Sequence, residues 1–176
     1  MTVTLRPAAR ADVPFLVELL AHSSVRPYLA AVRPSAPAEV AAEIERAAAE
    51  PEAYGLLVIE RDGRAAGTVS FTRTNRRSRI ADLHSLAVHP AARSGGTAAR
   101  AVGRLLDNLF GERGFHRVEC EVYGFNDRAA AFFERLGFTR EGARRRAYRH
   151  GDGWVDGIRF GLLAEEWHTR SGERRE

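Results

Sequence analysis

The fold is decided by residues 83–100, LHSLAVHPAARSGGTAAR. A short apolar run with β character stops at Pro90, a turn of small residues follows, and a long amphipathic pattern then begins. The first N–H groups of a helix have no intrahelical partner, and the helix start carries about half a positive charge. Gly95 and Gly96 allow this backbone to approach a bound group closely. The junction therefore predicts an anion site, which we interpret as a site for a pyrophosphate.

The chain beyond this turn alternates between helix and strand patterns. Apolar residues recur at spacings of three and four over residues 96–112 and predict a helix, and the alternation in His116–Tyr123 predicts a strand. Together with the strand Ile80–Val88 they predict a right-handed parallel unit. Asp127–Leu136 follows as a shorter helix, for which Asn126 is the expected cap.

The chain before and after this unit supplies further strands and helices. The pattern predicts a first strand at 2–6, a helix at 13–20 capped by Asp12, a helix at 38–50, a hairpin of 54–60 with 65–71, and a closing hairpin of 143–148 with 154–163. This order predicts a mixed α/β fold. We expect a single domain over residues 1–170 and a polar tail at 171–176.

Composition narrows the functional classes. All 27 basic residues are arginine, and the net charge of +4 suits an anionic cofactor without indicating a nucleic-acid partner. Cys120 is the single cysteine, which excludes an internal disulfide, and we expect it to be buried and the protein to hold no metal. No apolar run approaches the roughly 20 residues of a membrane span, and no secretory signal is recognised, so a cytoplasmic location is expected.

Two motifs relate the chain to a known family. Residues 93–98, RSGGTA, match the signature Gln/Arg-x-x-Gly-x-Gly/Ala. Residues 126–138 match Asn-x-x-Ala-x-x-(apolar)-Tyr-x-x-x-Gly-Phe, except that Phe133 replaces the tyrosine. On these motifs the stretch from about Leu83 to Trp167 resembles the GNAT superfamily of acyl-CoA-dependent N-acetyltransferases. Its C-terminal part is most similar to the ribosomal-protein alanine acetyltransferase branch.

The resemblance implies a GNAT fold of about seven strands and four helices, in which the fourth and fifth strands splay apart around acetyl-CoA. Strand residues would pair with the pantetheine arm, and the glycine turn would hold the pyrophosphate. Asn126 either touches the cofactor or only caps its helix. The expected cofactor-binding residues are Leu86, Ala87, Val88, Arg93, Ser94, Gly95, Gly96, Thr97, Ala98, Asn126 and Phe133.

Three residues are candidates for proton transfer. Period-two alternation predicts that Asp82 and His84 share one strand face with Leu86 and Val88. The surrounding string is similar to that of arylalkylamine acetyltransferases, whose two histidines at these positions conduct protons; here only His84 is a histidine. Glu121 occupies a position where some N-terminal acetyltransferases place a base. Each has a structural alternative, namely a partly buried strand histidine or a solvated carboxylate.

The expected reaction is direct attack of a primary amine on the thioester of acetyl-CoA. Deprotonating an alkylamine at pH 7 costs about 4.6 kcal/mol, against about 1 kcal/mol for an α-amine. A protein N-terminal α-amine is therefore our first expectation for the acceptor, with a small amine or aminoglycoside-type substrate as the alternative. Because Phe133 removes the expected tyrosine acid, a non-catalytic acyl-CoA sensor also stays open. We expect a monomer or homodimer.

One segment is interpreted as a lid over the acceptor. Residues 22–34 are irregular and carry Arg26, Tyr28 and Arg33. Tyr28 with Arg26 either shapes the acceptor pocket or simply packs within the lid. Trp154 and Trp167 are expected in the core or in an interface.

Overall fold

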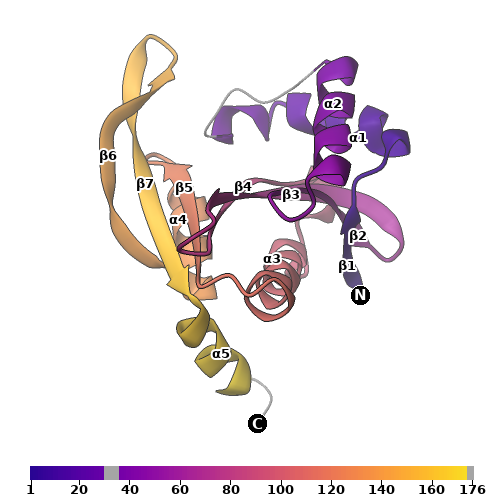
Figure 1. Cartoon of the computed structure of the whole chain (residues 1–176). Coiled ribbons are helices and arrows are strands. Elements are labelled where there is room, and N and C mark those ends of the chain that lie inside the picture. Colours follow the sequence, from indigo (N-terminus) through magenta and orange to yellow (C-terminus); the bar gives the residue numbers. More distant parts are fainter. Residues whose placement is uncertain (30–35, 174–176) are drawn as a thin grey trace.

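The structure, a computed structural model, describes residues 1–29 and 36–173 (Figure 1). Seven strands form one mixed sheet in the order β1-β2-β3-β4-β5-β7-β6, which confirms the predicted fold class. The strands are β1 (Val3–Pro7), β2 (Tyr54–Arg61), β3 (Arg64–Asn75), β4 (Ile80–Val88), β5 (Arg117–Tyr123), β6 (Thr139–His150) and β7 (Gly153–Leu163). The helices are α1 (Val13–Ala21), α2 (Pro37–Ala49), α3 (Thr97–Asp107), α4 (Asp127–Leu136) and α5 (Ala164–Glu173).

The helices divide between the two faces of the sheet. Helices α1 and α2 lie on one face over β2, β3 and β4, and α3 lies on the other (Figure 1). The β6–β7 hairpin rises on the side of α1 and α2 (Figure 1). The main core lies between the sheet and α3, and a smaller cluster lies under α1 and α2.

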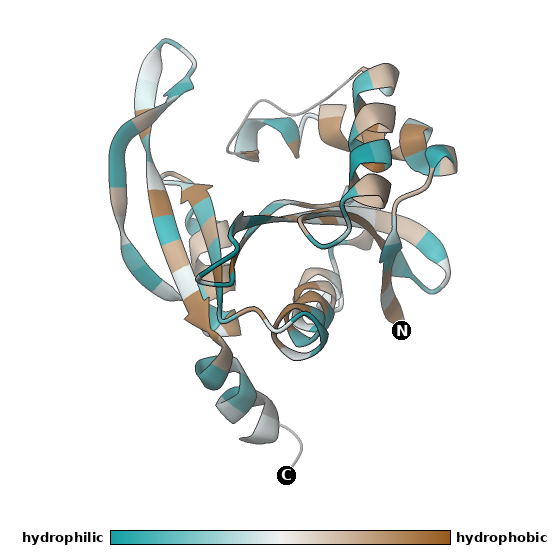
Figure 2. Ribbon diagram, viewed as in Figure 1, coloured by the Kyte–Doolittle hydropathy of each residue, from teal (hydrophilic) through white to brown (hydrophobic). Residues whose placement is uncertain are grey.

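Helix α3 is held by one apolar stripe, and Figure 2 shows its hydrophobic and hydrophilic faces. Its side chains at three- and four-residue spacing are buried, among them Val102, Leu105 and Leu106. Burying a leucine of this kind contributes about 1.5–3 kcal/mol. The α-helix ends at Asp107 and continues as a π-helical turn over Asn108–Glu112, within the predicted span of 96–112.

The C-terminal helix is a feature that the sequence pattern does not predict. Helix α5 extends to Glu173, three residues into the expected polar tail. Trp167 lies in the core as expected, and its Nε1 donates to Asp107 Oδ1 at 2.8 Å. Trp154, in contrast, is 59% exposed and is not a core residue. Within the described ranges, no helix is both long and apolar enough to span a bilayer.

Asp12 precedes α1 as predicted, but its predicted capping role is wrong. Its carboxylate makes no cap bond to α1 and instead accepts from Ala9 N and, at 2.7 and 2.8 Å, from the two terminal nitrogens of Arg6. Arg6 also donates to Glu60, at 2.7 Å. The hydrogen bonds from Arg6 hold the pKa of Asp12 below its ordinary value. Asp12 thus fixes the start of α1 to β1 and β2.

Asp12→Asn is expected to lower the free energy of unfolding by about 1–2 kcal/mol at pH 7, because it removes the charge from a mostly buried partner of Arg6. Since the pKa is depressed in the folded state, the carboxylate stabilises the fold above the unfolded-state pKa of about 3.9, and this stabilisation is lost as the pH falls further. Urea unfolding at pH 7 and pH 3 measures both effects. Glu45→Gln, in the exposed Arg10–Glu45 pair, is the control and should change stability by less than about 0.5 kcal/mol.

Candidate functional site

Strands β4 and β5 separate into a wedge at the centre of the sheet. They are parallel and form three successive pairs, the last of which is Asp82–Glu119. Beyond this pair β4 continues to Val88 and β5 to Tyr123 without pairing to each other, while their outer edges stay paired to β3 and β7. The predicted splay of the fourth and fifth strands is therefore confirmed. We call this opening the wedge; along its two sides the described residues of β4 and β5 do not pair with each other.

A bulge in β4 lies at the start of the wedge. Between the pairs Ser70–His84 and Thr68–Ala87, two residues of β4 oppose one residue of β3. Ser85 at the bulge has a φ of +54°, a left-handed conformation that is uncommon outside glycine. An extra residue of this kind turns the following side chains to the opposite face of the strand.

The bulge corrects the predicted alternation along β4. Leu83 belongs to the main core under α3, and Leu86 and Val88, three and five residues further on, pack against the same core. Asp82 and His84 lie on the other face, toward α1 and α2. The prediction that Asp82 and His84 share one strand face with Leu86 and Val88 is therefore wrong. Leu86 and Val88 line the wedge from the side of α3, and His84 approaches it from the other side.

His84 is held in place by two hydroxyl groups and an aromatic ring. Its Nε2 lies 2.9 Å from Thr72 Oγ1, and its Nδ1 lies 3.0 Å from Ser85 Oγ. The ring stacks on Tyr54 with a centroid separation of 6.2 Å. In neutral imidazole one nitrogen accepts and the other donates, so these hydroxyls fix the orientation of a group suited to accepting a proton.

A small cavity of about 40 Å³ lies beside Ser85 and Tyr54, both of which contact His84, and it is large enough for a water molecule. Burial and the neighbouring Glu43 carboxylate raise the pKa of Tyr54, so its hydroxyl stays protonated at neutral pH. The cavity is lined by Leu20, Val40, Glu43, Tyr54, Leu56, Thr68, Ser70 and Ser85. Hydroxyl groups therefore extend from His84 toward Glu43 on α2.

The glycine turn, residues 93–98, forms the predicted anion site geometry at the start of α3. Gly95 and Gly96 have φ angles of +70° and +76°. Among the described residues, no carbonyl accepts from the N–H groups of residues 95–98. A Cβ built on Gly96 would meet nothing within 4 Å. The turn thus presents free donors beside open space, which fits a pyrophosphate.

The polar side chains of the turn maintain its shape. Arg93 donates through Nε to Val88 O at 3.0 Å and through Nη2 to Ser24 Oγ at 2.8 Å, which joins the end of β4 to the segment after α1. The hydroxyl of the buried Thr97 donates to Ser94 O at 3.1 Å. The exposed part of the turn is the backbone of residues 94–96.

Asn126 and Phe133 both serve the structure of α4. Asn126 Oδ1 accepts from Ala129 N at 3.2 Å and caps the helix. Phe133 is 4% exposed and packs against Phe138 and Phe160 in the main core. A contact of either side chain with the cofactor stays a prediction.

Glu121 faces the same side of the sheet as His84, from the β5 edge of the wedge. Its carboxylate is mostly buried and accepts from Arg144 on β6 at 3.2 and 3.3 Å. Burial and this carboxylate raise the pKa of Tyr148 to about 12. The wedge therefore has His84 on one side and a charge-compensated Glu121 with a protonated tyrosine on the other.

Sequence reasoning misses an aromatic cluster where β5 ends. Tyr123 and Phe125 stack with centroids 5.2 Å apart, and Tyr28, Tyr148 and His150 contact them. Tyr28 lies in the short helix η2 (Arg26–Tyr28), within the segment predicted as a lid. The five rings come from three distant parts of the chain, so no local pattern indicates them. Arg33 of the predicted lid lies outside the described residues.

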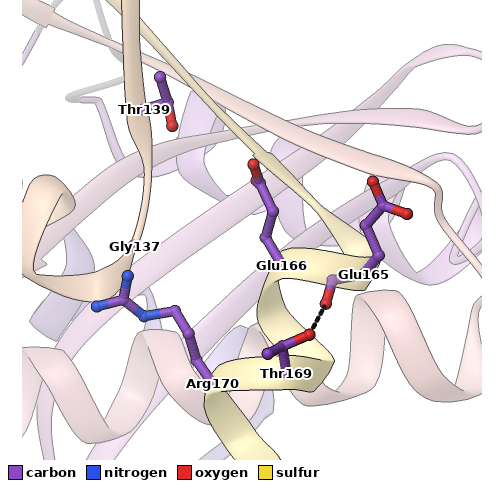
Figure 3. Close-up of a pocket in the computed structure, with 6 residues that line it drawn as sticks. All are labelled: Gly137, Thr139, Glu165, Glu166, Thr169 and Arg170. Atoms are coloured by element: carbon purple, nitrogen blue, oxygen red, sulfur yellow. Dashed lines mark hydrogen bonds between the residues drawn. The ribbon is translucent and has the colours of Figure 1, made fainter.

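A second hollow lies at the other end of β7, between the end of α4 and α5 (Figure 3). None of the predicted site residues lines it. The lining residues are Gly137, Thr139, Glu165, Glu166, Thr169 and Arg170. In the part of the chain that the structure describes, no group of three or more His, Cys, Asp and Glu residues is placed to bind a metal.

A splayed pair of parallel strands that leads to a glycine turn and a helix start defines an acyl-CoA-binding transferase. The family model described as the acetyltransferase (GNAT) family matches residues 18–138, and the chain belongs to this family. It is an N-acetyltransferase, with acetyl-CoA as its acetyl donor. The expected family and class of enzyme are therefore confirmed.

The chain is similar to a known sequence and to several solved structures. It is 28% identical over 123 residues to the SPbeta prophage-derived uncharacterized N-acetyltransferase YokL of Bacillus subtilis (strain 168). These 123 residues make up 70% of this chain and 69% of that protein. A spermidine N-acetyltransferase from Vibrio cholerae in complex with CoA and spermine has a TM-score of 0.85 at 22% identity, over 94% of this chain and 98% of that one. A SpeG chimera from Vibrio cholerae and hSSAT has a TM-score of 0.86 at 21% identity, over 97% of this chain and 100% of that chain. The structural likenesses establish the fold.

Proposed function

We propose that this chain acetylates the primary amine of a small molecule. The observation that carries the proposal is the wedge, which opens beyond Asp82–Glu119 with His84 beside its narrow end. The similar Vibrio cholerae spermidine N-acetyltransferase, solved with CoA and spermine, supports a small amine better than the protein N-terminus that the sequence favours first.

Acetyl-CoA is proposed to bind along the β4 edge of the wedge. The N–H groups of residues 95–98 would hold the pyrophosphate, and the backbone of Leu86–Val88 would pair with the pantetheine arm as an added strand does. Bound in this way, the cofactor supplies an activated acetyl thioester at the narrow end. Backbone N–H groups of β4 that face the wedge after the bulge would be suited to stabilising negative charge on its carbonyl oxygen.

His84 is proposed as the group that accepts the amine proton. An alkylamine with a pKa near 10.4 arrives protonated, and its deprotonation at pH 7 costs about 4.6 kcal/mol. The hydroxyls of Thr72 and Ser85 hold the imidazole, and the small cavity beside Ser85 is lined by Tyr54 and Glu43. The carboxylate of Asp82 would attract the ammonium form of the acceptor to this side of the sheet.

The leaving thiolate needs little assistance. A thiol pKa near 8.5 makes the thiolate an acceptable leaving group at neutral pH, so the loss of the tyrosine at Phe133 leaves the reaction feasible. Tyr148, with a pKa raised to about 12, keeps its proton at neutral pH and lies beside Glu121 at the wedge. It is a candidate proton donor that the sequence motif does not indicate.

An acceptor panel tests this function by following the release of free CoA thiol. With acetyl-CoA we expect small primary amines to be acetylated with a kcat/KM at least about tenfold above that of a peptide with an N-terminal alanine, a difference of about 1.4 kcal/mol in transition-state stabilisation. A faster reaction with the peptide would refute the small-molecule assignment. CoA binding without thiol release from any acceptor would instead identify a sensor.

A further inference from the structure

We propose that the aromatic cluster of Tyr28, Tyr123, Phe125, Tyr148 and His150 binds the non-reacting part of the acceptor, which is a monoamine with an aromatic or apolar body. This inference rests on the proposed function, and it narrows the substrate class within it. It also makes Tyr28 and Phe125 specificity-determining residues.

The cluster is partly open to solvent. Phe125 is 41% exposed and Tyr28 is 50% exposed, and their ring centroids lie 6.1 Å apart. Phe125 also contacts His150 at 4.6 Å. Tyr28 comes from the segment after α1, Phe125 from the turn after β5, and His150 from the end of β6. Exposed aromatic rings gathered from three segments are typical of a binding surface.

The cluster lies next to the proposed reaction site. Val118, Cys120 and Val122 of β5 point into the main core, so Glu121 and Tyr123 point to the opposite side, which is that of His84. At about 3.3 Å per residue, Tyr123 lies about 7 Å beyond Glu121 along the strand. An amine placed between His84 and Glu121 therefore has its body over Tyr123 and Phe125.

The charges around the cluster disfavour a polycation. Glu121 is already paired with Arg144, and Glu119 accepts from Arg117 and Arg159. A polyamine would have to compete with these arginines for Glu119 and Glu121. Arg26 adjoins the cluster in η2 and is exposed. A monoamine with a flat or apolar body fits this surface better. Its single ammonium group would lie near Glu121, which Arg144 already neutralises, and its body would contact the faces of the aromatic rings.

Kinetics with two probe amines test the inference. We expect 2-phenylethylamine to have a higher kcat/KM than spermidine in the wild-type enzyme. Tyr28→Ala and Phe125→Ala should each raise the KM for 2-phenylethylamine about 3–10-fold, because each removes an aromatic contact. The KM for acetyl-CoA should stay unchanged, and Phe125→Tyr should restore the KM for the amine. Trp154→Ala is the matched control, since this exposed ring lies on β7 against Arg149 and should leave the KM unchanged.

The outcomes separate the inference from the proposed function. A preference for spermidine, or an unchanged KM for 2-phenylethylamine in both Tyr28→Ala and Phe125→Ala, overturns the inference while small-amine acetylation stands. An equal rise in Trp154→Ala also overturns it, because the effect would not belong to the cluster. Acetylation of neither amine while CoA still binds overturns the proposed function, and the inference with it.

Discussion

Replacing Gly96 with valine is expected to weaken CoA binding at least about 100-fold, equivalent to about 2.7 kcal/mol. The N–H groups of residues 95–98 have no acceptor among the described residues, and the space next to Gly96 is open. A valine side chain would fill the space that the pyrophosphate is proposed to occupy. The φ of +76° also makes any side chain costly there, by about 1–2 kcal/mol, and would distort the turn.

Gly114→Val is the control for this backbone strain. Gly114 has a φ of +63°, a Cβ there would also meet nothing within 4 Å, and it lies beyond the far end of α3. Both variants carry a similar conformational cost, but only Gly96→Val should lose CoA. Calorimetric titration with CoA measures the affinities, and thermal unfolding checks that both variants fold. Unchanged affinity in Gly96→Val, or an equal loss in both variants, would contradict the proposed role of the glycine turn.

His84→Gln is expected to lower kcat about 10²–10⁴-fold at pH 7, the usual contribution of a general base. Glutamine keeps hydrogen-bonding groups beside Thr72 and Ser85 but does not accept a proton near neutral pH. The Kd for CoA should not change. The loss should become smaller as the pH rises toward the amine pKa of about 10.4, because the free amine then needs no base.

His116→Gln is the control for His84→Gln, because it makes the same exchange at a histidine outside the site. His116 is exposed just before β5, at the opposite end of that strand from the aromatic cluster. It should retain the wild-type kcat across the same pH series, measured as CoA thiol release. A His84→Gln enzyme with an unchanged kcat, or with a loss that is constant across pH, would assign His84 a structural role in β4.

The local features of the fold could be predicted from the sequence, whereas the features that depend on tertiary contacts could not. The glycine turn is local, and the positive φ angles at Gly95 and Gly96 follow from the residue type. The bulge at Ser85 requires a left-handed serine, which nothing in the alternation of residues 80–88 indicates. A single extra residue in the strand moved Leu86 and Val88 to the face opposite His84.

Two other features depend on contacts between different elements of the fold. Helix α5 is held by Trp167, whose ring packs in the main core and bonds to Asp107 on α3, so its helical state does not follow from its own polar sequence. Asp12 has the position of a helix cap, but its carboxylate is held by the charged guanidinium of Arg6 and makes no bond to the N–H groups of α1. The aromatic cluster could not be predicted either, because its rings come from three segments that only the folded chain brings together.

A crystal structure with bound CoA tests the central claim of this account most directly. The claim is that the wedge between β4 and β5 is the acetyl-transfer site. We predict that the pyrophosphate accepts hydrogen bonds from the N–H groups of residues 95–98, that the pantetheine arm pairs with the backbone of Leu86–Val88, and that the sulfur lies at the narrow end near His84. CoA bound elsewhere, with the wedge closed by other groups, would contradict the claim.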